Sequence, residues 1–202
     1  MESKQLIISV SREFGSGGHI IAEELARRFD LPLYDNNIIS EVAAGKNLDE
    51  KNMEKYDEVP RNKLFSRKVR GYSNSPEENI AHMQFDFLRK KANEGESFVI
   101  VGRCAETILK ENPHLVTVFV LGDMDKKIAR ITQINHISES EAEKMIAYQD
   151  RKRKNYHNYY CPMKWGDSRN YEISINSSKL GIEHTQDILE CYIRERMKVF
   201  SE

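Results

Sequence analysis

A glycine-rich segment near the start of the chain could bind a phosphate group. Gly15, Gly17 and Gly18 follow an apolar run at 6–10 and precede an amphipathic stretch at 20–29. Glycine has no Cβ atom, so the backbone N–H groups of such a turn can close around an anion. A helix that begins at the same point directs the positive end of its dipole toward that anion. The segment therefore predicts a phosphate site between a strand and a helix.

The same segment departs from the Walker A pattern, which reads G-x-x-x-x-G-K-S/T. With Gly17 as the last glycine of the pattern, Arg12 stands at the first glycine. Gly18 then takes the lysine position and His19 the hydroxyl position. The alternative interpretation is a strand-to-helix turn that binds nothing, because such turns are common in α/β domains. The candidates to supply the charge of the missing lysine are Arg12, His19, Arg130 and Arg153.

The composition favours a single soluble domain. The 202 residues include 31 Lys plus Arg and 32 Asp plus Glu, for a formal net charge of −1. That length can bury a sizeable core, and we expect one domain over residues 1–202. The balanced charge gives no basic field for nucleic acid. The N-terminus shows no signal-peptide pattern and no apolar run reaches transmembrane length, so we expect a cytoplasmic protein without membrane partners.

The cysteines are few and widely spaced, at Cys104, Cys161 and Cys191. They form no C-x-x-C pair, which disfavours a disulfide framework or a zinc knuckle and favours a reducing compartment. His157 and Cys161 stand four residues apart and could share a helix face. Two ligands do not make a zinc site, so we expect these side chains to be solvated or packed.

Apolar runs alternate with stretches of helical period along the chain. Strands are expected at 6–10, 98–101, 116–121 and 171–175, with a short fifth strand at 31–34. Helices are expected at 20–29, 76–92, 138–160 and 182–200. Runs rich in β-branched and aromatic residues are typical of strands covered on both faces. The alternation predicts right-handed crossovers and a parallel sheet.

Two regions do not follow this alternation. Residues 36–95 are polar and mixed in charge, and we expect no strand in them. Residues 150–170 are basic and aromatic. Both retain apolar or aromatic anchors, so we interpret them as ordered inserts above the carboxyl ends of the strands, where open α/β sheets bind ligands.

Several segments, taken in order, resemble the cytidylate kinase-like family, a branch of the P-loop nucleoside monophosphate kinases. They are S-V-S-R-E-F-G-S-G-G at 9–18, L-P-L-Y-D at 31–35, V-I-V-G-R at 99–103, D-R-K-R at 150–153, W-G-D at 165–167, N-Y at 170–171 and I-N-S-S at 175–178. The resemblance covers nearly the whole chain. It implies a three-layer α/β/α P-loop kinase fold with a mostly five-stranded parallel sheet. It also implies that 36–95 is a monophosphate-binding arm and 150–170 a lid that closes over the phosphates.

The resemblance implies an ATP-dependent kinase that acts on a nucleoside monophosphate, with CMP or dCMP as the leading acceptor and Mg²⁺ as cofactor. The implied catalytic residues are Arg12, Arg103, Asp150 and Arg153. Those implied for phosphate or ATP are Gly15, Ser16, Gly17, Gly18, His19 and Arg130. Those implied for the acceptor are Tyr34, Asp35 and Arg103. For magnesium the first candidate is Ser16, and Ser11 or Asp35 could serve instead, because the ion prefers oxygen ligands.

The family's G-R-D motif is only partly present. Gly102 and Arg103 match it, whereas Cys104 replaces the aspartate and Val101 replaces an acidic residue often found before the glycine. These departures, with the missing lysine, leave two alternatives open: a catalytically inactive nucleotide- or phosphate-binding regulatory protein, or a kinase of a different small metabolite. An RNA-binding role for the basic-aromatic segment is disfavoured by the balanced charge.

The basic-aromatic segment has structural interpretations as well. Asp150 and Arg153 could orient a guanidinium on a phosphate or form an ordinary helix ion pair. The aromatic residues Tyr156, Tyr159, Tyr160 and Trp165 recur at helical spacing. We expect at least half of them to pack the segment against the domain.

Overall fold

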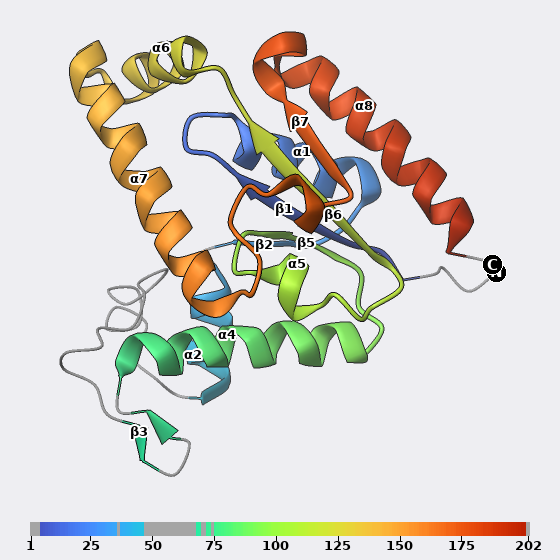
Figure 1. Cartoon of the computed structure of the whole chain (residues 1–202). Helices are drawn as coiled ribbons and strands as arrows, with labels where there is room; N and C mark the ends of the chain where they lie inside the picture. The colour runs from blue at the N-terminus through green and yellow to red at the C-terminus, as the bar shows by residue number, and fades with distance from the viewer. Residues whose placement is uncertain (1–4, 36, 47–67, 70–71, 74, 201–202) are drawn as a thin grey trace.

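The computed structural model describes residues 5–35, 37–46, 68–69, 72–73 and 75–200. Its centre is a five-stranded parallel sheet in the order β2-β5-β1-β6-β7 (Figure 1). The strands are β1 Ile7–Arg12, β2 Leu33–Tyr34, β5 Phe98–Val101, β6 Leu115–Leu121 and β7 Ile173–Asn176. This sheet confirms the five strands expected from the apolar runs.

Helices cover both faces of the sheet (Figure 1). They are α1 Gly18–Phe29, α2 Asn37–Lys46, α4 Pro76–Asn93, α5 Ala105–Ile108, α6 Met124–Asn135, α7 Glu139–Tyr160 and α8 Ser177–Val199. A short 3₁₀ turn follows α7 at Ser168–Asn170. The three-layer α/β/α fold expected from the sequence is therefore confirmed.

Neighbouring residues of β1 belong to different halves of the core. Ile7 packs in a cluster with α2, α4 and α5. Ile8 and Val10 pack in a second cluster with α1 and α8. Because alternate side chains of a strand point to opposite faces, a central strand that is covered twice must be apolar at nearly every position.

Helix boundaries follow local signals in the sequence. Ser138 caps α7, and its side chain and that of Glu141 form a reciprocal capping box. Gly181, with φ 78°, interrupts α8 after its first turn. The expected last helix at 182–200 corresponds to the part of α8 after this break.

The structure corrects the prediction that residues 36–95 contain no strand. Lys68–Val69 (β3) and Tyr72–Ser73 (β4) form an antiparallel ribbon. Strands of two residues are too short to show the alternation from which a strand is predicted. Helices α2, α5 and α6 were not predicted. Much of 36–95 lies outside the described residues, and its role as an acceptor arm stays a prediction.

The predicted lid at 150–170 begins within α7, whose second half carries its basic residues.

Among the helices in the described part of the chain, none is both long and apolar enough to cross a membrane.

Candidate functional site

The glycine-rich turn joins the end of β1 to the start of α1, as the sequence predicted. Gly15 and Gly17 have φ angles of 81° and 82°, which residues other than glycine rarely adopt. The buried Ser16 donates its hydroxyl hydrogen to the Glu13 carbonyl at 2.9 Å. Arg130 on α6 donates to the Gly15 carbonyl, and burial lowers the pKa of Arg130. The turn is therefore fixed from within and from α6.

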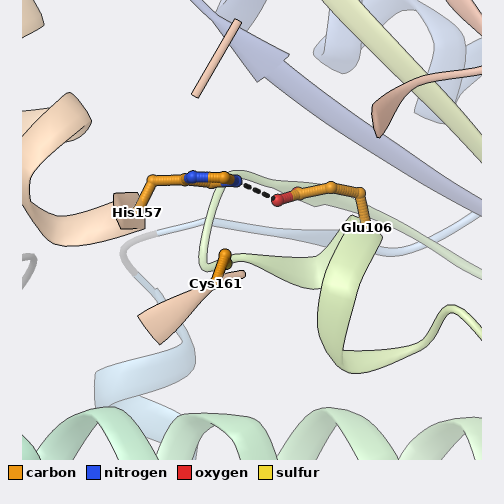
Figure 2. A group of neighbouring side chains, drawn as sticks. All are labelled: Glu106, His157 and Cys161. Carbon is orange, nitrogen blue, oxygen red and sulfur yellow. Dashed lines mark hydrogen bonds and ion pairs between the residues drawn. The ribbon is translucent and has the colours of Figure 1, made fainter. Parts of the chain in front are cut away.

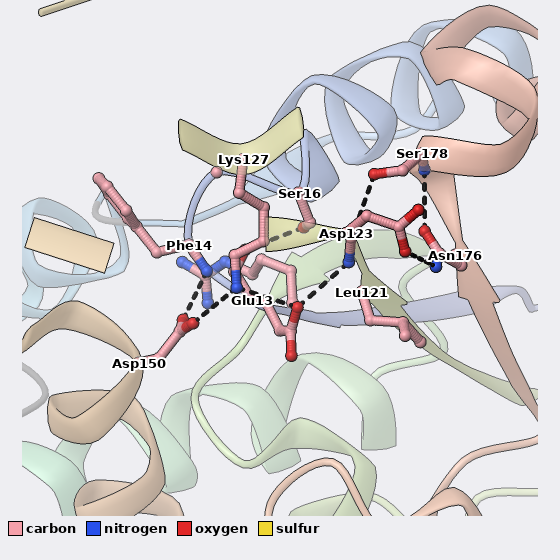
Figure 3. A network of polar contacts seen from close by, with 12 residues as sticks. Glu13, Phe14, Ser16, Leu121, Asp123, Lys127, Asp150, Asn176 and Ser178 are labelled. Carbon is pink, nitrogen blue, oxygen red and sulfur yellow. Dashed lines mark hydrogen bonds and ion pairs between the residues drawn. The ribbon is translucent and has the colours of Figure 1, made fainter. Parts of the chain in front are cut away.

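A second set of contacts ties the turn to the start of α8. The Ser177 hydroxyl donates to the Ser16 carbonyl. Next to it, Asp123 after β6 accepts from the Asn176 side chain at 2.7 Å, and the Asp123 N–H donates to the Ser178 hydroxyl at 2.9 Å (Figure 3). The I-N-S-S segment thus links the ends of β6 and β7 to the turn.

A cavity of about 680 Å³ opens over the turn. The predicted site residues that line it are Arg12, Gly15, Gly17, Gly18, His19, Asp35, Arg130 and Arg153. Lys152 adds a further cation, and Glu13 a further carboxylate, to the walls. Cations outnumber carboxylates here, which suits an anionic ligand such as a polyphosphate.

Arg12 takes space that a side chain at position 18 would need. A Cβ atom placed on Gly18 would lie 2.5 Å from the Arg12 Cβ and 3.0 Å from its Cγ. Real Cβ atoms essentially never approach that closely, and the obstructing atoms are the stem of Arg12 rather than its flexible end. The arginine at the first glycine position therefore requires the glycine at the lysine position.

A buried lysine holds two carboxylates beside the turn (Figure 3). Lys127 on α6 donates to Glu13 Oε2 at 3.1 Å and to Asp150 Oδ2 at 2.9 Å. Glu13 Oε2 also accepts from the Gly122 N–H at 3.1 Å. The other Asp150 oxygen accepts from the Phe14 N–H at 2.6 Å. A carboxylate of α7 thus occupies one N–H group of the turn, as a phosphate oxygen would.

Sequence reasoning missed Lys127 and Glu13. Both belong to charged stretches that are normally solvated. The available signal was weak: Lys127 follows β6 by one turn of helix, at the same sheet edge as the glycine-rich turn.

Arg153 reaches the turn from α7. Its guanidinium donates to the Arg12 carbonyl at 3.2 Å and lies over the Phe14 ring, 5.5 Å from the centroid. It lines a second, smaller cavity of about 20 Å³ together with Arg12 and Arg103. The three predicted arginines are therefore brought together although they come from β1, the end of β5 and α7.

Arg103 is almost completely buried, at 1% exposure. It and Cys104 have left-handed φ angles of 56° and 57°, directly after Gly102 at 74°. Such conformations cost free energy in non-glycine residues and are concentrated at functional sites. Cys104 packs against Phe85 and Tyr156 in an apolar cluster, so its side chain is part of the core there.

His19, at the hydroxyl position of the pattern, contacts two carboxylates. Its Nδ1 lies 3.1 Å from Asp35 Oδ2 and its Nε2 lies 3.3 Å from Glu23 Oε1. The other Asp35 oxygen, Oδ1, is buried and has no hydrogen-bond partner in the described part of the chain. Asp35 therefore offers an oxygen ligand at the cavity wall, whereas the Ser16 hydroxyl is directed to the Glu13 carbonyl.

Tyr34, predicted to contact the acceptor, lies in the core beneath the sheet. Its ring packs edge-on against Phe87 and Phe98, and its hydroxyl donates to Glu96 Oε1 at 2.6 Å. Burial, followed by the Glu96 hydrogen bond, raises the pKa of Tyr34 to about 12. Tyr34 lines neither of the two cavities. In this position the Tyr34 ring packs against Phe87 of α4, and its contact with the acceptor stays a prediction.

The aromatic residues of the basic segment pack as expected. Tyr160 makes ring contacts with Tyr156 at 4.9 Å, with Tyr159 at 4.7 Å and with Phe85 at 5.3 Å. Trp165 meets Phe119 of β6 at 5.4 Å. These contacts fasten the second half of α7 and the segment after it to the domain.

Comparison with known proteins agrees with this architecture. A family model described as the cytidylate kinase-like family matches residues 7–179. Among solved structures, an uncharacterized protein from Eubacterium ventriosum is 40% identical, with 94% of this chain and 99% of that chain covered and a TM-score of 0.75. No curated protein matches the chain.

More distant structures share the fold. Shikimate kinase from Bacteroides thetaiotaomicron is 13% identical, with 94% of this chain and 98% of that chain covered and a TM-score of 0.55. A sugar kinase from Janibacter sp. is 12% identical, with 94% of this chain and 95% of that chain covered and a TM-score of 0.54. At this identity the likeness shows the fold alone, since one fold hosts many activities.

Proposed function

The chain belongs to the cytidylate kinase-like family, and from this premise we propose that it transfers the γ-phosphoryl group of ATP to a small anionic acceptor. The leading acceptor is a nucleoside monophosphate, CMP or dCMP. Phosphoryl transfer requires positioning and positive charge more than covalent chemistry. The residues around the glycine-rich turn offer both.

The convergence of Arg12, Arg103 and Arg153 carries this proposal. All three line the small cavity, and Arg12 and Arg153 also line the large one. A phosphoryl group transferred from a donor in the large cavity would lie next to Arg12 and Arg153, which line both cavities. Arginine binds phosphate oxygens in bidentate fashion, and its charge can stabilise the transferring phosphoryl group.

We assign to Arg12 the charge that the Walker lysine supplies elsewhere. Its side chain starts in the space next to Gly18 and lines the cavity over the turn. An arginine beside a phosphate in a partly dry site contributes about 4 kcal/mol of attraction at an intermediate dielectric constant. The loop would then be a rearranged phosphate cradle rather than a defective one.

The nucleoside end of ATP would lie against α6. Ile131 and Ile134 give the cavity an apolar wall, and Asn135 adds an amide at its edge. Ile134 is 57% exposed, a large apolar surface that a planar base would cover. An apolar wall with a few polar groups is typical of sites for such ligands.

Asp35 is the residue best suited to hold Mg²⁺. Its buried Oδ1 oxygen, left without a partner among the described residues, fits a hard cation, and His19 beside it does not. When bound, magnesium neutralises charge on the phosphate oxygens. Asp35 would thereby act on the donor phosphates, whereas the sequence resemblance assigned it to the acceptor.

The second half of α7 would act as the lid. Its segment 150–170 carries Arg153, and Asp150 already occupies the Phe14 N–H. An incoming phosphate would compete with that carboxylate for the N–H. Held in place by the ring contacts of Tyr160 and Trp165, the segment would keep water, which otherwise accepts the phosphoryl group, out of the site.

A nucleotide- or phosphate-binding regulatory protein without transfer activity is the alternative. The observation that favours it is the Asp150 carboxylate on the turn, which blocks one donor of the phosphate cradle. A kinase of another small metabolite is the other alternative. Cys104 in place of the family's aspartate is packed in the core and leaves Arg103 to recognise any anionic acceptor.

A coupled assay of ADP formation tests the proposal. ATP and Mg²⁺ are offered with a panel of nucleoside monophosphates and small hydroxylated metabolites, and the Arg153→Ala variant controls for contaminating kinases. Acceptor-dependent ADP formation that is highest with CMP or dCMP supports the proposal. Tight ATP binding without transfer to any acceptor supports the regulatory alternative and overturns the enzyme assignment.

A further inference from the structure

Three buried side chains that the proposed transfer reaction does not use form a compact group (Figure 2). The ligand atoms of Glu106, His157 and Cys161 all lie within 4.8 Å of one another. Glu106 belongs to the first turn of α5, His157 to the last turn of α7, and Cys161 ends α7. His157 and Cys161 stand at helical spacing in the sequence, and the fold brings the Glu106 carboxylate to them.

We propose that Glu106, His157 and Cys161 bind a zinc ion, with a water molecule as the fourth ligand. Imidazole nitrogen, thiolate sulfur and carboxylate oxygen are the three ligand types that zinc takes in proteins. Magnesium and calcium prefer oxygen alone, so this mixed set selects a softer metal. The small cavity of about 20 Å³ is lined by His157 and has room for roughly one water molecule.

The neighbours of the group orient its ligands. Asn158 Oδ1 accepts from the Trp165 N–H at 2.8 Å, which identifies that atom as the amide oxygen. His157 Nδ1, 3.4 Å from the same oxygen, can donate to it, and Nε2 faces Glu106 Oε1 at 2.7 Å. The Ser11 hydroxyl donates to the second Glu106 oxygen at 3.3 Å. Such outer hydrogen bonds fix the tautomer and direction of metal ligands.

A zinc ion would also supply charge to this group. Glu106 and Cys161 are both buried, and a carboxylate and a thiolate side by side would place two negative charges there. Buried anions require a compensating charge, and a divalent cation that binds both ligands would compensate both at once.

The ligand atoms, which lie within 4.8 Å of one another, must adjust to admit the ion. Glu106 Oε1 and His157 Nε2 are hydrogen-bonded at 2.7 Å. Ligands at ~2.0 Å from a tetrahedral zinc ion lie ~3.3 Å apart, so the pair must separate by roughly 0.6 Å. The ion would tie α5 to the end of α7 and so fix the segments that carry Arg103 and Arg153.

Cobalt substitution and metal analysis of the full chain test this site. The reduced protein is loaded with Co²⁺ or Zn²⁺, desalted, and measured by absorption spectroscopy and elemental analysis. We expect one metal ion per chain and a thiolate-to-cobalt absorption band. Cys161→Ser should abolish the band and weaken zinc binding by more than ~100-fold, because it removes a ligand. Cys191→Ser, which changes an exposed thiol, should leave both unchanged.

The same measurements can overturn the proposal. Folded, reduced protein that retains no cobalt or zinc contradicts it, as does a Cys161→Ser variant with an unchanged cobalt spectrum. A Cys104–Cys161 disulfide that forms readily in air while no metal binds to the reduced protein would assign these thiols to redox chemistry instead.

Discussion

A Cβ atom on Gly18 would lie 2.5 Å from the Cβ atom of Arg12. The two positions correspond to the lysine and the first glycine of the Walker A pattern. A side chain can therefore start from one of them but not from both. The absence of a lysine and the presence of an arginine are thus one structural feature, with the cation moved from the helix to the strand.

This relationship predicts a specific steric coupling. Gly18→Ala should lower the free energy of unfolding by ~1–3 kcal/mol, because overpacking a tight site has that cost. Arg12→Gly should relieve the clash, whereas Arg12→Ala retains the obstructing Cβ atom and should not. Urea unfolding of the single and double variants gives the coupling energy. If Gly18→Ala lowers the free energy of unfolding equally in the Arg12→Gly and Arg12→Ala backgrounds, the contact between positions 12 and 18 is wrong.

Lys127 should stabilise the folded protein through its contacts with Glu13 and Asp150. Lys127→Met leaves Glu13 and Asp150 without their shared partner. We expect a loss of ~2 kcal/mol, less than for a fully buried pair because both carboxylates are partly exposed. The matched control is Lys126→Met, which changes the exposed neighbour on the same helix. If both variants unfold at the same urea concentration as the wild type, the network contributes nothing measurable.

Arg153 should act on the transferring group. Arg153→Ala should reduce turnover by ~100-fold with ATP affinity nearly unchanged, since a lost contact to transition-state charge costs about 3 kcal/mol. Arg151→Ala, an exposed change two residues earlier on α7, should leave turnover unchanged. Steady-state kinetics and ATP titration of the three proteins measure both quantities. Full turnover in Arg153→Ala would remove this residue from the site.

Tyr34 distinguishes the structural assignment from the sequence prediction. Tyr34→Phe should cost ~1 kcal/mol through the lost Glu96 hydrogen bond. Because burial raises the pKa of Tyr34 to about 12, the folded state retains the phenol proton where the unfolded state loses it. The contribution of the protonated Tyr34 phenol to the free energy of unfolding is complete below pH ~10 and is lost as pH rises toward about 12.

The free energy of unfolding, measured across that alkaline range, should therefore fall less steeply with pH for Tyr34→Phe than for the wild type. The acceptor KM should not change, because Tyr34 lines neither cavity. A raised KM with unchanged stability would instead return Tyr34 to the acceptor site.

The sheet could be predicted from the sequence because its strands are covered on both faces. Runs such as Phe98–Val101 and Leu115–Leu121 are apolar throughout, and their order fixes a parallel α/β fold. Helix α6 was not predicted, although Met124, Ile128, Ile131 and Ile134 recur in it at helical spacing. The β3–β4 ribbon was missed because two-residue strands carry no periodicity.

The site could be predicted in its residue types but not in its pairings. The glycine turn, Arg12 and Arg153 follow from pattern and resemblance. Asp150, however, bonds the Phe14 N–H, 136 positions away, and Lys127, 23 positions away. Such contacts depend on how α6 and α7 meet the turn, which no local spacing in the chain encodes. The contact between Arg12 and Gly18 likewise exists only once β1 and α1 are joined.

The central claim is that Arg12 supplies the charge of the Walker lysine, and ATP titration of an exchange variant tests it most directly. Arg12→Ala should weaken ATP binding by ~10- to 100-fold, the effect of losing a charged hydrogen bond. The double variant Arg12→Gly/Gly18→Lys recreates the G-x-x-x-x-G-K order and should recover most of that affinity. Wild-type affinity in Arg12→Ala, or no recovery in a folded double variant, would contradict the account.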